Sequence, residues 1–200
     1  MASFARPGGR ATGLTSLNVD LDAKRLEILK QAIPGVSRVG VLTAPQDTAH
    51  RVRLVTIEST AKSLGLQLHF MNVSRAEDVP RVFDAATWAR VGAIMLFGAP
   101  PLLQYQARIV ELATKARLPL IAAWSEFAEA GGLMTYGTNV PAMFRRAAAV
   151  TDRILRGANP AEIPVERVTT FELVINRRTA QMLRIDIPTA VVLRADRVIQ

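Results

Sequence analysis

The sequence contains no cysteine, and this absence excludes several classes of site. Without thiols the chain has no disulfide framework, no thiolate-ligated zinc and no cysteine nucleophile. Histidine is almost as scarce: only His50 and His69 occur, and no carboxylate or serine is arranged around either one by sequence. Motifs of zinc proteases, serine hydrolases and nucleotide-binding loops are also missing. The sequence therefore predicts no metal site, no cofactor and no catalytic residue.

Long apolar runs are absent as well. No run approaches the roughly 18 residues that a membrane-spanning helix needs, so we expect no direct membrane insertion. The opening residues MASFARPGG lack the apolar core of an export signal. The turn-rich segment that follows, Pro7 to Gly13, fits neither common phosphate-binding template, and we interpret it as a strand-to-loop turn.

Lysine is rare in a chain that is nevertheless basic. The net charge is +8, and only four of the 25 basic residues are lysines (Lys24, Lys30, Lys62 and Lys115). The arginines are scattered, no run of five like charges occurs, and no aromatic residues interleave with them. This pattern favours a solvated basic surface over a nucleic-acid interface.

Short apolar runs alternate with segments of helical periodicity along most of the chain. We expect helices at residues 20–33, 48–64, 77–90, 103–117, 141–155 and 179–183. We expect strands at residues 38–43, 66–71, 93–97, 120–123, 133–136 and 171–175, with a tail at 193–200. This alternation predicts an α/β fold with a mostly parallel sheet flanked by helices.

The rest of the chain is organised around the segment from Leu118 to Ala147, in which two expected strands end in polar and aromatic residues. Ligands of open α/β sheets bind at the carboxyl ends of the strands. Trp124, Phe127 and Tyr136 gather there, and either core packing or ligand stacking accounts for them. Glu126 and Glu129 are an acid/base pair or two solvated carboxylates. The candidate ligand contacts are Thr43, Pro100, Trp124, Ser125, Glu126, Tyr136 and Asn139.

Several motifs in the same order resemble one bacterial family. They read PGGRATGLTSLN, KRLEILKQAIPGVSRVGVL, EFAEAGGLMTYGTNVPAMFRRAAAVTDRILRGANPAEIPVE, FELVINRRTAQMLRIDIP and LRADRVI. From about Pro7 to the end, the chain resembles the substrate-binding proteins of ABC transporters, including those for tryptophan and tyrosine uptake. This resemblance implies a fold like the type I periplasmic binding proteins, in which two α/β lobes close on a solute.

The resemblance also implies a domain division. Residues 1–35 would be a remnant of the first lobe and the hinge, and residues 36–137 the second lobe. Residues 138–164 would be a crossover helix of the first lobe, and residues 165–200 a return strand, a short helix and the tail. Most of the first lobe would then be missing, with Met1 to Arg6 resembling the end of one of its helices. The apolar stripes of residues 20–33 and 141–155 would keep fewer partners.

Two further departures from the family pattern concern the expected cleft. Ala44 precedes Pro45 where the family usually has asparagine, and an acidic residue often found after the strand ending at Phe97 is replaced near Ala99. Each departure removes a polar group from the expected ligand site.

Three functions follow as hypotheses. The first is the solute-binding component of an ABC importer, which binds a small organic solute such as an amino acid between its lobes. It would deliver the solute to permease and ATPase subunits without catalysis, in the periplasm by resemblance or in the cytoplasm if Met1 is the true start. The second is a cytoplasmic ligand-sensing regulator of the same fold, or a truncated fragment without function. The third is an α/β enzyme that uses Glu126.

Overall fold

The computed structural model describes residues 3–16 and 18–200, and the chain falls into two units. Unit 1 comprises Met1–Leu17 and Thr138–Phe171, and unit 2 comprises Asn18–Gly137 and Glu172–Gln200. Met1 and Ala2, part of the expected helix end, lie outside the described residues. Ser3 to Arg6 form a turn, because the Arg6 N–H bonds to the Ser3 hydroxyl at 3.0 Å instead of continuing a helix.

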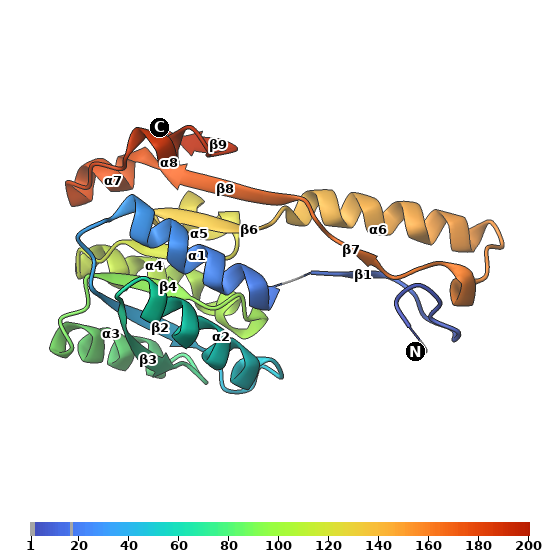
Figure 1. The fold of residues 1–200 in the computed structure, drawn as a ribbon, viewed down its shortest axis with the longest axis horizontal. Coiled ribbons are helices and arrows are strands. Elements are labelled where there is room, and N and C mark those ends of the chain that lie inside the picture. Colours follow the sequence, from blue (N-terminus) through green and yellow to red (C-terminus); the bar gives the residue numbers. More distant parts are fainter. Residues whose placement is uncertain (1–2, 17) are drawn as a thin grey trace. The chain divides into compact units, whose positions relative to one another are not determined.

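A seven-stranded sheet forms the centre of unit 2 (Figure 1), with the strand order β3-β2-β4-β5-β6-β8-β9. Two of its strands, β6 and β8, extend to the boundary with unit 1. The strands are β2 (Arg38–Thr43), β3 (Gln67–Asn72), β4 (Ala93–Leu96), β5 (Leu120–Ala122), β6 (Met134–Thr138), β8 (Phe171–Asn176) and β9 (Arg197–Ile199).

Helices connect these strands. They are α1 (Asn18–Ala32), α2 (His50–Ser63), α3 (Asp78–Trp88), the 3-10 helix η1 (Pro100–Tyr105), α4 (Gln106–Lys115), α5 (Ser125–Glu129), α7 (Arg177–Leu183) and α8 (Thr189–Val192). The chain steps outward from β2 to β3 and then back across β2 to β4. Because such crossovers are right-handed, α2 covers one face of the sheet, and α3 and α4 cover the other. Helix α1 packs against α2, and α3 packs against α4, as this arrangement requires.

The five strands from β3 to β6 are mutually parallel, with registers such as Leu42 opposite Leu96 and Met95 opposite Ile121. Strand β8 runs the other way, because the N–H of Asn176 at its end bonds to the carbonyl of Leu133 just before β6. Strand β9 pairs parallel with β8. The predicted α/β fold with a mostly parallel sheet is therefore confirmed.

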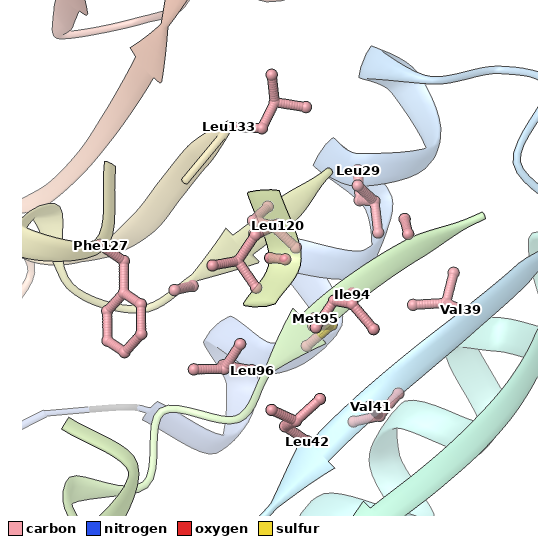
Figure 2. Close-up of a cluster of buried hydrophobic side chains, with 14 of the residues drawn as sticks. Leu29, Val39, Val41, Leu42, Ile94, Met95, Leu96, Leu120, Phe127 and Leu133 are labelled. Carbon is pink, nitrogen blue, oxygen red and sulfur yellow. The ribbon is translucent and has the colours of Figure 1, made fainter. Parts of the chain in front are cut away.

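The core of unit 2 explains why the apolar runs form strands. Val39, Val41, Ile94, Met95 and Leu120 are all at most 1% exposed, as expected for strands covered on both faces. Figure 2 shows them together with Leu29 from α1 and Phe127 from α5. Each apolar helix stripe faces this sheet, so the burial of apolar surface holds unit 2 together.

Unit 1 is smaller and contains β1 (Leu14–Thr15), α6 (Val140–Leu155), the 3-10 helix η2 (Pro160–Glu162) and β7 (Glu166–Arg167). Strands β1 and β7 pair in parallel, with Leu14 opposite Glu166. The Thr12 hydroxyl donates to the carbonyl of Ile163 at 2.7 Å, next to this pair. Apolar side chains on α6 are exposed, with Phe144 66% and Leu155 81% accessible.

The structure differs from the expected domain division at residues 18–35. Helix α1 belongs to unit 2, where Leu26 and Leu29 are completely buried. Its apolar stripe does not lack partners, because α2, β5 and α8 all pack against it. The structure adds two elements that the sequence does not predict: helix α8, just before the expected tail at 193–200, and strand β9 within that tail. The 3-10 helix η1 replaces the first turn of the expected 103–117 helix.

Candidate functional site

The carboxyl ends of β2, β4, β5 and β6 lie side by side at one edge of the sheet. Extending the strand registers by one or two residues places Thr43, Phe97, Ala123 and Tyr136 in one row along this edge. The chain leaves β2 toward one face and β4 toward the other, so the topological switch point lies between these two strands. Ligands of open α/β sheets bind at such a point, outside the strand ends.

A buried charge network fills this switch point, and the sequence analysis did not identify it. The Asp22 carboxylate on α1 accepts hydrogen bonds from the guanidinium groups of Arg25 and Arg53. Its Oδ1 atom also accepts from the Gly98 N–H at 3.2 Å, in the loop after β4. Asp22 and Arg25 are fully buried, and Arg53 is 4% exposed. Three donors thus converge on one carboxylate that has no access to water.

Arg53 connects the two sides of the switch point. Its Nε atom donates to Asp47 in the loop after β2 at 2.8 Å, and its Nη2 atom donates to the carbonyl of Gly98 at 3.1 Å. The guanidinium also lies over the ring of Phe97, 5.9 Å from the centroid. Two acidic and two basic side chains therefore tie α1, α2 and both loops together, and their formal charges cancel.

Burial governs the protonation of this network. Burial raises the pKa of the Asp22 carboxyl above its usual value, although Arg25, Arg53 and the Gly98 N–H all oppose that rise. Burial likewise lowers the pKa of Arg25 to about 10, and the charge of Asp22 opposes this shift. Arg25 therefore stays protonated at neutral pH. Its Nε atom donates to the carbonyl of Tyr136 at 2.7 Å, which extends the network toward β6.

Sequence spacing contained a signal for these residues. Asp22 and Arg25 fall on the same helical stripe as Leu26 and Leu29, which steps by three and four along α1. A carboxylate and a guanidinium on an apolar stripe are buried together, and buried charges require partners.

Trp124, Ser125 and Glu126 lie where β5 passes into α5. Trp124 is the residue before the helix, and its ring stacks on the buried Phe127 with centroids 6.4 Å apart and an interplanar angle of 27°. Trp124 and Ser125 are partly exposed, and Glu126 is exposed. One face of Trp124 thus serves packing, whereas the polar side chains next to it reach solvent.

Thr43 does not offer a free hydroxyl at this edge. Its side chain is fully buried, and the hydroxyl lies 2.6 Å from Oδ1 of Asn72 at the end of β3. Ala44 is also buried, at 1% exposure. The end of β2 therefore serves packing between strands in this structure.

Pro100, Tyr136 and Asn139 have different surroundings. Pro100 is exposed at the start of η1, and Ala99 before it is fully buried. Tyr136 in β6 is partly exposed, and its backbone carbonyl holds Arg25. Asn139 belongs to unit 1, where its side-chain oxygen caps α6 by accepting from the Ala142 N–H at 2.9 Å. The structure thus brings together Pro100, Trp124, Ser125, Glu126 and Tyr136 along one edge of unit 2.

The cap at Asn139 gives a direct prediction for unit 1. Replacing Asn139 with alanine leaves the first turn of α6 without an acceptor for the Ala142 N–H, so we expect a loss of about 1 kcal/mol in stability. Asn139→Ser keeps a capping oxygen and serves as the control. Urea unfolding monitored by far-UV circular dichroism measures both variants. Equal stability of the alanine and serine variants would contradict the capping role.

Two cavities of unit 2 lie away from the candidate edge. One of about 140 Å³ is lined by residues of α7 and α8 and the loop between them, and another of about 310 Å³ by Arg177, Arg178, Gln181 and Gln200. Both adjoin the carboxyl end of β8, which lies beside the amino end of β6, at the opposite edge of the sheet. The described residues contain no cluster of three or more metal-ligating side chains, and none of the helices in this part of the chain could cross a membrane.

The profile of one family, described as ABC transporter substrate binding protein, matches residues 1–199. The chain belongs to this family. The resemblance seen in the sequence motifs is therefore confirmed over nearly the whole chain. A search of curated proteins found no matching relative.

Solved structures agree with this assignment. A Streptococcus pneumoniae ABC domain in complex with L-Trp shares 24% identity with a TM-score of 0.87, and the match covers 100% of this chain and 68% of that one. A conserved domain protein from Vibrio cholerae shares 25% identity with a TM-score of 0.81, covering 94% of this chain and 62% of that one. The family member described here thus spans about two thirds of the length of these proteins.

The same fold occurs in regulators. A LacI family transcriptional regulator from Bifidobacterium animalis subsp. lactis shares 14% identity with a TM-score of 0.63, and the match covers 81% of this chain and 61% of that one. At this identity the likeness concerns the fold alone. The family assignment therefore rests on the family match and not on the fold.

Proposed function

We propose that this chain binds a small organic solute at the carboxyl-end edge of unit 2, as the solute-binding component of an ABC importer. The bound solute would pass to the permease and ATPase subunits without chemical change, outside the cytoplasm as is normal for the family. The observation that carries the proposal is the group of partly exposed aromatic and hydroxyl side chains on two adjacent strands: Trp124 and Ser125 follow the end of β5, and Tyr136 lies within β6. It rests also on the family match.

The charge network occupies one part of this edge and so limits where a solute can bind. Asp22, Arg25 and Arg53 occupy the switch point between β2 and β4 and form hydrogen bonds with one another and with Gly98. Of these three side chains, Arg25 has one buried atom, Nη2, that meets no hydrogen-bond partner among the described residues. A solute would therefore contact the β5 and β6 side of the edge, next to Trp124, Ser125 and Tyr136. Thr43 is not included among the proposed contacts, because its hydroxyl is buried and bonded to Asn72.

The side chains of this half of the edge favour an amino acid as the solute. The ring of Trp124 offers an apolar surface, and the Ser125 hydroxyl offers a hydrogen bond. The exposed carboxylate of Glu126 suits an ammonium group. The solved relative that holds L-Trp supports the same class of solute. We keep Asn139, which lies in unit 1, as a further predicted contact.

The two tryptophans make the proposal testable. Trp88 lies 88% exposed on α3, far along the chain from Trp124, so Trp88→Phe leaves Trp124 as the only indole emitter. We expect amino-acid binding to change the fluorescence of this variant without loss of affinity. In Trp124→Ala the loss of aromatic contact should raise the Kd by about tenfold or more. Isothermal titration calorimetry with a panel of the twenty amino acids measures the affinities.

Two outcomes would contradict the proposal. If Trp124→Ala binds a solute as tightly as the Trp88→Phe control, the site lies elsewhere. If no amino acid binds to the wild-type chain or raises its melting temperature, the proposal that the solute is an amino acid is wrong. If a sugar or another solute binds in the same assay, the proposed binding site at the edge of unit 2 stands and the proposed class of solute changes.

A further inference from the structure

The strand β3 ends the sheet of unit 2 on one side, and its outer edge carries a regular set of backbone groups. The N–H of Gln67 bonds to Ser37 and the N–H of Val73 bonds to Thr43, both on the β2 side. Along a strand, the backbone N–H and C=O groups of successive residues point alternately to the two sides of the strand. The N–H and C=O groups of Leu68, Phe70 and Asn72 therefore point away from β2. Six residues of β3 are paired with β2 without interruption, so no bulge bends this edge.

The edge of β3 lacks the features that usually prevent strand pairing. Its sequence, QLHFMN, contains no lysine, arginine, carboxylate or proline, which are the residues that protect sheet edges. The opposite edge is different, because β9 has only three residues and its Arg197 forms ion pairs with Glu129 and Glu172. Of the two edge strands described in this seven-stranded sheet, β3 therefore presents the longer edge, with six residues that another strand can extend.

A groove runs beside this edge on the face covered by α2. It has a volume of about 290 Å³ and is lined by Glu58, Ala61 and Lys62 of α2 together with Leu66, Leu68 and Phe70. The Phe70 side chain is 37% exposed here. Val55, one turn before Glu58 on the same helical stripe, is 70% exposed and extends the apolar surface along α2.

The charges of the groove are complementary to those of a second copy of the same groove. Glu58 and Lys62 stand one turn apart, so a twofold rotation brings Glu58 of one copy toward Lys62 of the other, and the reverse. The two charges cancel, and β3 contains no lysine, arginine, aspartate or glutamate. In a chain with a net charge of +8, this is a neutral and partly apolar surface on which two copies can approach.

We propose that the β3 edge and the groove beside it form the interface between two copies of this chain. The two β3 strands would pair antiparallel about a twofold axis, with Phe70 opposite Phe70 of the second copy and Leu68 opposite Asn72. The outward backbone groups of the three residues then bond across the axis. The α2 helices of both copies lie on the same face of the joined sheet, where their Glu58 and Lys62 side chains form two reciprocal ion pairs.

Charge reversal tests this arrangement without disturbing the core, because Glu58 and Lys62 are both exposed. Glu58→Lys and Lys62→Glu each place like charges across the axis, so each variant alone should dimerise at least about tenfold more weakly than wild type. An equimolar mixture of the two variants restores opposite charges and should form a heterodimer. Analytical ultracentrifugation over a range of concentrations measures the four dissociation constants, those of wild type, each variant and the mixture, and circular dichroism checks the fold.

A second pair of variants tests the strand edge itself. Phe70→Lys adds a protective charge and should abolish the dimer, whereas Trp88→Lys removes another exposed aromatic residue, from α3, and should leave the dimer intact. A wild-type chain that stays monomeric at every concentration would overturn the proposal. So would a dimer that survives Phe70→Lys, or a charge-reversed mixture that stays as monomeric as its components.

Discussion

Replacing Asp22 with asparagine is expected to lower the free energy of unfolding of unit 2 by about 3–5 kcal/mol. The carboxylate of Asp22 accepts hydrogen bonds from Arg25, Arg53 and the Gly98 N–H, and neither arginine can reach solvent from its position. Removing the negative charge leaves two buried guanidinium groups with only Asp47 to balance them. A buried charge without a partner costs far more than the network gains from one ion pair.

The control for this variant stands on the same helix. Glu27 pairs with Lys24 at 2.7 Å on the surface of α1, where the two side chains are 38% and 41% exposed. Water screens that pair, so Glu27→Gln should change stability by no more than about 1 kcal/mol. Urea unfolding of both variants gives the comparison. A loss in Asp22→Asn as small as that in Glu27→Gln would show that the network carries no stability.

A triple variant separates charge balance from packing. If Asp22, Arg25 and Arg53 are replaced together by leucine or methionine, the buried charges of the cluster are removed together. Asp47, on the rim of the cluster, then loses its ion pair with Arg53. Apolar replacement of a complete buried network is often neutral or stabilising. We therefore expect the triple variant to be more stable than Asp22→Asn. The reverse order would indicate that the volume and shape of the network, rather than its charges, hold the switch point together.

The spacing of apolar residues predicted most elements of unit 2, because these elements are long and their buried residues recur at regular intervals. Helix α2 and strand β4 follow from stripes and apolar runs that local sequence alone defines. Strand β9 was missed because it has three residues and becomes a strand only by pairing with β8. The same holds for β1 and β7, which have two residues each and meet across more than a hundred positions.

The candidate site was predicted in outline and not in its central part. The sequence places Trp124 and Tyr136 at strand ends, and the topology then puts those ends next to each other. The sequence does not reveal that the Thr43 hydroxyl donates its hydrogen bond to Asn72, because that contact depends on the register between β2 and β3. The charge network likewise joins residues from α1, α2 and two loops, and only the folded chain brings them together.

Gly137 is the second position at which a small change should have a large effect. It follows Tyr136 in β6, directly beside the end of β5, and a Cβ atom added there would lie 1.9 Å from the carbonyl oxygen of Ala123. The obstructing atom belongs to the backbone, so no side-chain rotation relieves the overlap. Strands β5 and β6 must move apart, and we expect Gly137→Ala to destabilise unit 2 by about 3 kcal/mol or more.

Gly35→Ala is the matched control, because a Cβ atom there meets nothing within 4 Å. An alanine at such a site is neutral or stabilises by about 0.4–1 kcal/mol through the unfolded chain. Gly137→Ala should also weaken solute binding beyond its effect on stability, since the carbonyl of Ala123 immediately precedes Trp124. Thermal unfolding and calorimetric titration below the melting temperature measure the two effects separately. If Gly137→Ala and Gly35→Ala have the same melting temperature, then β5 and β6 are not packed as closely at this edge as the 1.9 Å approach requires.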